Sequence, residues 1–96
     1  MARARGEATI PCIVWPGWFT HERSIRVDIP GIENIIAFVD ERDVIVPKEP
    51  TKESGVKGRC KVHIVSREGG TAIVDLPQPS IHSGTRFSIP MTFLEE

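Results

Sequence analysis

The chain has 96 residues, 40% hydrophobic and 26% charged, a balance typical of a single soluble globular domain rather than of a disordered chain. Twelve Lys and Arg residues against thirteen Asp and Glu residues leave a net charge of −1, which lacks the basic excess of a dedicated nucleic-acid-binding protein. No apolar run reaches the ~18 residues of a membrane span, and residues 1–7 lack the apolar stretch of a signal peptide. We therefore expect a cytoplasmic protein with a flexible tail over residues 1–7 and no membrane partner.

Valine and isoleucine are frequent, and glycine or proline interrupts the apolar runs every ten residues or so, which is typical of short β-strands. The pattern predicts six main strands and a seventh, over residues 8–15, 18–29, 35–40, 43–47, 57–67, 71–77 and 85–94. Residues 31–40 also have a helical spacing of apolar side chains, at Ile32, Ile35, Ile36 and Val39. The β-branched side chains and the preceding Pro30-Gly31 favour a strand there, with a short helix as the alternative.

These strands predict an all-β fold, with the whole of residues 1–96 in one domain: a small antiparallel barrel or a compact sandwich of six to seven strands. Residues 36–39 and 44–46 are apolar on both faces of their strands. Such strands are usually covered on both sides, so either closure into a barrel or a partner subunit is implied. Residues 47–56 are rich in charge and proline and predict a mobile surface loop.

The sequence predicts the register of the hairpin formed by strands 57–67 and 71–77. A two-residue loop would place Ile64 opposite Asp75 and bury a carboxylate. A three-residue loop over residues 68–70 instead pairs Ile64 with Val74, and the glycines supply a position for a bulge. On the outer face this register forms two pairs: His63 with Asp75, and Val65 with Ile73.

Basic side chains gather on the same long strand. With strict alternation, Lys57, Arg59, Lys61 and Arg67 share its outer face. A small barrel that binds single-stranded nucleic acid would use such a stripe. Nucleic acid is nevertheless a disfavoured partner, because only 6% of the residues are aromatic and tyrosine is absent. The four phenylalanines lie in apolar runs and are expected in the core: Phe19, Phe38, Phe87 and Phe93.

The pair of His63 and Asp75 suggests a second alternative, a small hydrolase in which the carboxylate orients the imidazole. We expect Cys60 and Cys12 to point into the core, where neither thiol reaches this pair, so an exposed cross-strand pair is favoured and no catalytic residue is assigned. Cys60 and His63 have a spacing seen in zinc sites, but residues three apart on a strand point to opposite faces. No metal or cofactor is therefore expected.

Trp15 and Trp18 flank the Pro16-Gly17 turn, where two indoles are difficult to bury completely. Tryptophan is also enriched in the energetically dominant parts of interfaces. Val65 and Ile73 form a second apolar pair on a nominally outer face. Our leading hypothesis is a non-catalytic binding module that self-associates, with a dimer favoured, through one of these surfaces. A small-molecule or protein ligand is the other partner considered, and a simple extension of the core is the alternative for both pairs.

Overall fold

The structure is a computed structural model that describes residues 6–81 and 84–96. The described residues form seven strands and two 3₁₀-helices: β1 (Glu7–Pro16), β2 (Glu22–Val27), β3 (Ile36–Asp40), η1 (Glu41–Asp43), β4 (Val44–Ile45), β5 (Val56–Glu68), β6 (Thr71–Ser80), β7 (Gly84–Pro90) and η2 (Met91–Phe93). None of the helices in this part of the chain is long or apolar enough to cross a membrane.

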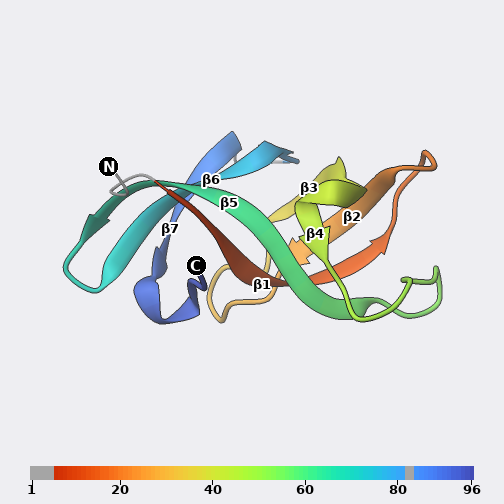
Figure 1. Cartoon of the computed structure of the whole chain (residues 1–96), viewed down its shortest axis with the longest axis horizontal. Coiled ribbons are helices and arrows are strands. Elements are labelled where there is room, and N and C mark those ends of the chain that lie inside the picture. Colours follow the sequence, from red (N-terminus) through yellow and green to blue (C-terminus); the bar gives the residue numbers. More distant parts are fainter. Residues whose placement is uncertain (1–5, 82–83) are drawn as a thin grey trace.

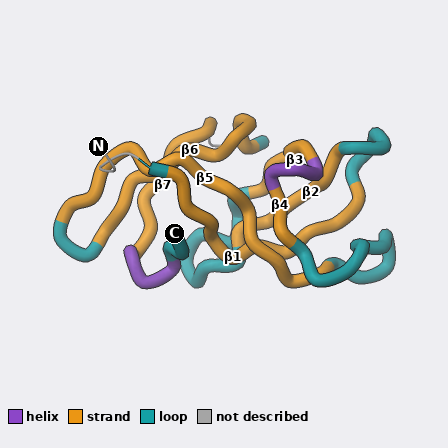
Figure 2. Tube along the Cα trace, in the orientation of Figure 1, coloured by secondary structure: helices purple, strands orange, loops and turns teal. Residues whose placement is uncertain are grey.

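The strands form one antiparallel sheet in the order β4-β5-β1-β2-β3-β6-β7, and β5 also pairs with β6. This last pairing closes β5, β1, β2, β3 and β6 into a five-stranded barrel, to which β4 and β7 are added. The predicted all-β single domain is therefore confirmed, and of the two architectures expected it is the barrel. The β5–β6 hairpin lies at one end of the long axis, and the β1–β2 connection and the loop before β5 lie at the other (Figure 1; Figure 2).

Strict alternation along the strands builds the core. On β1 every second residue is buried, and the residues between them are half-buried or exposed. The predicted inward faces of β5 and β6 are correct, with both cysteines among the buried side chains. The largest fully buried side chains are Ile10, Ile25, Ile29, Ile64, Ile89, Val14, Val27, Val39, Val74, Cys12 and Cys60.

Several boundaries differ from the prediction. The strand predicted over residues 18–29 covers only 22–27, because residues 17–21 form the connection from β1. Residues 31–40 contain a strand, as favoured, but it begins at Ile36. The flexible tail predicted over residues 1–7 does not include Gly6 and Glu7. The Gly6 carbonyl accepts a hydrogen bond from Ile64 N at 2.7 Å, and Glu7 begins β1. Residues 1–5 lie outside the described part of the chain.

The register of the β5–β6 hairpin is partly as predicted. Ile64 pairs with Val74, and His63 lies opposite Asp75. The loop, however, has two residues, with a positive φ only at its first, Gly69 (62°), as in a type II′ turn. A bulge at Val65 takes up the extra residue, so Ser66 rather than Val65 lies opposite Ile73.

The two strands expected to be covered on both faces are not. Ile36 on β3 is 36% exposed and Ile45 on β4 is 54% exposed. The contact between β3 and β6 that helps close the barrel is short. It consists of the Ala37–Ser80 pair and a hydrogen bond of 2.8 Å from Ile81 N to the Ile36 carbonyl. The outer faces of both strands thus remain open to solvent.

Candidate functional site at the aromatic end of the barrel

The connection between β1 and β2 carries the most exposed aromatic side chains of the described residues. Trp18 is 82% exposed and Phe19 is 76% exposed. The backbone that carries them is fixed by three hydrogen bonds: Gly17 N to the Glu22 carbonyl (2.9 Å), Glu22 N to the Phe19 carbonyl (3.0 Å) and Trp18 N to Glu22 Oε1 (2.7 Å). A Cβ on Gly17 would lie 2.8 Å from the Glu22 backbone carbon, so the turn requires glycine. An ordered loop therefore presents two apolar rings to solvent.

Trp15 occupies a different environment from Trp18. It pairs with Ser24, which pairs with Phe38, so the three side chains form a row on the outer face of β1, β2 and β3. A Cβ on Gly55 would lie 2.6 Å from Trp15 Cε2, which shows that the loop before β5 packs against the indole. The side chain is half-buried. Trp15 thus supports the packing of this loop and is not a second free ring.

Two hollows flank the β1–β2 connection and share Phe38 between them. The first, the Trp18 hollow, has a volume of about 450 Å³ and is lined by Trp15, Trp18, Phe38 and Lys52, among others. The second, the Phe19 hollow, is the larger at about 580 Å³ and is lined by Phe19, Phe38, Glu22 and Asp40, among others. Residues 46–55 carry the predicted charged loop, and Val56, which the prediction included in the loop, already belongs to β5.

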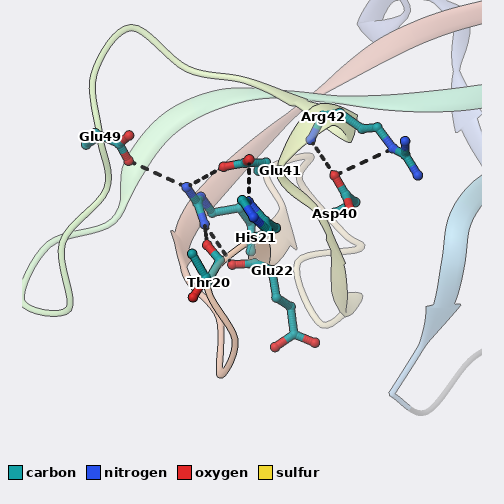
Figure 3. A network of polar contacts seen from close by, with 8 residues as sticks. Thr20, His21, Glu22, Asp40, Glu41, Arg42 and Glu49 are labelled. Atoms are coloured by element: carbon teal, nitrogen blue, oxygen red, sulfur yellow. Dashed lines mark hydrogen bonds and ion pairs between the residues drawn. The ribbon is translucent and has the colours of Figure 1, made fainter.

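A polar network joins this connection to η1 (Figure 3). The Arg23 guanidinium, on a side chain only 12% exposed, donates to the Thr20 carbonyl and contacts Glu41 at 3.1 Å and Glu49 at 3.6 Å. His21 Nδ1 lies 2.8 Å from the other oxygen of Glu41. The network links the β1–β2 connection to η1 and, through Glu49, to the loop before β5.

The predicted basic stripe is not one surface. The Arg59 guanidinium donates to Thr9 Oγ1 (2.7 Å), to the Thr9 carbonyl (2.9 Å) and to the Phe93 carbonyl (3.0 Å), and it lies 3.0 Å from Glu95 Oε1. These contacts tie the C-terminal segment to β1, next to the isolated bridge between Thr9 and Glu95. Arg59 is therefore engaged in holding the fold together.

The bulge in β5 also separates Arg67 from the other three basic residues. Arg67 pairs with the buried Ala72, so it lies on the face of Ile64 and not on that of Lys61. Its guanidinium contacts Glu96 at 2.8 Å. The prediction that Arg67 shares the outer face is wrong, and only Lys57 and Lys61 remain exposed and without an ion pair within the described residues.

His63 and Asp75 lie opposite each other and line a small hollow of about 150 Å³. The carboxylate is engaged elsewhere, because Arg86 donates to both of its oxygens at 2.9 and 3.0 Å. These hydrogen bonds, with a smaller contribution from the charge of His63, lower the pKa of Asp75. The arrangement binds the carboxylate to Arg86 and does not direct it to the imidazole.

The two cysteines are not available as nucleophiles beside this pair. Both cysteines are free and buried, and burial raises the pKa of Cys12 to about 12 and that of Cys60 further still. The predicted apolar pair of Val65 and Ile73 does not form. Ile73 is flanked by Ser66 on one side and Ser88 on the other. This leaves the β1–β2 connection, whose Trp18 and Phe19 are the two most exposed large apolar side chains of the described residues.

Comparison of the chain with protein-family models, curated proteins and solved structures gave no match. Sequence reasoning found Trp15 and Trp18 but placed Phe19 and Phe38 in the core. Phe19 belongs to the connection, and Phe38 alternates outward from the buried Ala37 and Val39. The alternation within residues 36–40 was the signal that could have identified Phe38. Phe87 and Phe93 do pack against the core, as predicted.

Proposed function

We propose that this protein is a non-catalytic binding module that self-associates as a homodimer through its aromatic end. The observation that carries the proposal is the 82% exposure of Trp18 on a loop whose backbone is fixed by hydrogen bonds. An indole held in water by an ordered loop carries a free-energy cost for its hydrated apolar surface. Burial of that surface in an interface removes the cost.

The shape of this surface favours a second copy as the occupant. A two-fold dimer needs a patch that is complementary to itself, with a projecting group and a recess for it on the same surface. The exposed Trp18 stands at the Trp18 hollow, which it lines together with Trp15 and Phe38. In a two-fold arrangement each Trp18 enters the hollow of the other copy. The two free, buried thiols suit a reducing compartment, and we propose the cytoplasm.

The alternatives have less support from the geometry. A nucleic-acid stripe would need Arg59 and Arg67, whose guanidinium groups contact Glu95 and Glu96. A hydrolase would need the carboxylate of Asp75 to orient His63, whereas that carboxylate is held by Arg86.

Sedimentation velocity over a range of concentrations tests the proposal, with Trp18→Ala as the variant. We expect a dimer for the wild type and a dissociation constant at least about tenfold higher for Trp18→Ala, as for a central interface aromatic. Ile45→Ala is the matched control, because Ile45 is also exposed but lies on β4. A wild type that stays monomeric at about 100 μM, or a Trp18→Ala dimer of unchanged affinity, would refute the proposal.

A further inference from the structure

The Trp18 hollow has a positively charged aromatic lining. Its volume of about 450 Å³ lies within the range of small-molecule sites. Trp15, Trp18 and Phe38 line it together with Ser24, and Lys52 is its only charged lining residue. The Phe19 hollow and the hollow beside His63, by contrast, are both lined by carboxylates. A recess of aromatic rings with one ammonium group suits a ligand ring that carries a negative charge.

A second cation lies next to this hollow on β2. Arg26 follows Ser24 by two residues, and the alternation of the strand places both side chains on the outer face. Two residues of a strand span about 6.5–7 Å, which an arginine side chain can cover. Across β5, β1, β2 and β3 the row that contains Arg26 consists of Lys57, Ile13, Arg26 and Ile36. A row with two cations therefore runs beside the row that contains Trp15 and Phe38.

Arg26 has no partner in the part of the chain that the structure describes. Every other arginine described there contacts a carboxylate, whereas Arg26 forms no ion pair. Its Nε is buried without a hydrogen-bond partner, and no other described side chain has such an atom. A buried donor without a partner costs free energy, and a guanidinium without a carboxylate is a favourable partner for an anion.

The charges on the two sides of the aromatic row have opposite signs. Arg26 and Lys57 lie in the row on one side, and Glu22 and Asp40 form a directly opposed pair in the row on the other. A negative group is therefore attracted to the Arg26 side and repelled from the Glu22 side. The surface accommodates one aromatic ring with one anionic group next to it, and a longer run of phosphates would meet the two carboxylates.

From these observations we infer that the Trp18 hollow binds a single nucleotide. The base lies against the aromatic rings, on which bases stack. The phosphate lies at Lys52 and Arg26, because guanidinium and ammonium groups are the usual protein partners of phosphate. The spacing of the two rows is comparable to the separation of base and 5′-phosphate within one nucleotide.

The nucleotide occupies the hollow that receives the Trp18 of the other copy in the proposed dimer. Binding of the nucleotide and of the second copy should therefore exclude each other. This competition rests on the proposed function, whereas the nucleotide site itself does not.

Titration of the ¹⁵N-labelled protein with three matched compounds, followed by NMR, tests the site. The compounds are adenosine 5′-monophosphate (AMP), adenosine, which lacks the phosphate, and ribose 5-phosphate, which lacks the base. We expect AMP to shift the indole N–H signals of Trp15 and Trp18 and the amide signals of Ser24 and Arg26. Adenosine and ribose 5-phosphate should each bind at least about fivefold more weakly.

Three results of this titration would overturn the inference. The first is the absence of shifts at about 10 mM AMP. The second is binding of adenosine or of ribose 5-phosphate that equals the binding of AMP. The third is a single-stranded tetranucleotide that binds at least about tenfold more tightly than AMP, which would identify a nucleic-acid strand as the ligand.

Two charge-removing variants make the test specific. Lys52→Gln and Arg26→Gln should each weaken AMP binding about fivefold and leave adenosine binding unchanged, as expected for the loss of one partly exposed charge. Arg26→Lys keeps the charge and should retain most of the affinity. Lys48→Gln is the matched control, because Lys48 is exposed in the same loop but lines a different hollow. Unaltered AMP affinity in both site variants, or an equal loss of adenosine binding, would overturn the inference.

Sedimentation velocity separates this inference from the dimer proposal. Saturating AMP should convert wild-type dimers into monomers, and Lys52→Gln should still dimerise while binding AMP more weakly. A dimer that persists with AMP bound would overturn the assignment of the nucleotide to the Trp18 hollow. A monomeric wild type that binds AMP would refute the dimer alone, and a dimer that binds no AMP would refute the nucleotide site alone.

Discussion

Arg59 offers the sharpest test of how this barrel is held together, because the sequence places it in a binding stripe and the structure places it in a structural contact. The change is Arg59→Met, which keeps an unbranched apolar stem and removes the guanidinium. The variant loses three hydrogen bonds, to Thr9 Oγ1, the Thr9 carbonyl and the Phe93 carbonyl, and the ion pair with Glu95. Hydrogen bonds to charged groups contribute about 1.5–3 kcal/mol each.

The simple sum overstates the loss. The Thr9 carbonyl also accepts a hydrogen bond from Glu95 N at 3.0 Å, and the Arg59 side chain is 29% exposed, so water replaces part of what is removed. We therefore expect the free energy of unfolding to fall by about 2 kcal/mol, which corresponds to a fall in Tm of roughly 8–16 °C for a domain of this size. Urea and thermal unfolding followed by circular dichroism measure both quantities.

The control for this experiment is Lys61→Met, at an exposed position two residues further along β5, where the expected change is below about 0.5 kcal/mol. If Arg59→Met were as stable as the control, the C-terminal segment would be held by other contacts. The guanidinium would then be free for a ligand, and the nucleic-acid hypothesis would regain its central residue.

Three further predictions follow from contacts described above. Asp75 has a folded-state pKa below its ordinary 3.8 because Arg86 donates two hydrogen bonds to it. The stability that the ionised Asp75 adds to the fold is therefore complete above pH 3.8 and is lost as the pH falls through the lowered pKa. Below about pH 4 the wild type should lose urea stability more steeply than Asp75→Asn, and parallel pH profiles would contradict this. Cys12 and Cys60 should resist Ellman's reagent at pH 8 in the native state and react once urea unfolds the chain, since burial raises the pKa of both thiols; rapid labelling of the folded protein would be inconsistent with it. Gly55→Ala should lower the free energy of unfolding by about 1–3 kcal/mol, because its Cβ would lie 2.5 Å from a side-chain atom of β1, and an unchanged urea midpoint would show that the loop can move away.

Much of the barrel could be predicted because alternation is a local property. Residues such as Cys60, Val62 and Ile64 reveal their inward face from the sequence alone, and all three are buried. The opposition of His63 and Asp75 followed from the same pattern together with the need to keep a carboxylate out of the core.

The errors arise where a non-local contact or a small irregularity decides the outcome. A bulge at Val65 shifts the outward face of β5 by one residue, which moves Arg67 away from the basic stripe. No local pattern shows that Arg59 meets residues 34 to 50 positions away in the chain. The exposure of Phe19 similarly depends on the width of the β1–β2 connection, which the Pro-Gly turn alone did not fix.

The pairing of β1 has a consequence for the time course of folding. Its partner β5 follows about 50 residues later, and the bridge from Thr9 reaches Glu95, 86 residues away. Contacts of such sequence separation form only after long loops have closed, so we expect this barrel to fold on the slow, millisecond-to-second scale of all-β domains. During synthesis β1 can pair early with β2, but its other edge remains unpaired until β5 has been made. Until then much of its edge is open to pairing with other chains, which makes nascent molecules the species most prone to aggregation.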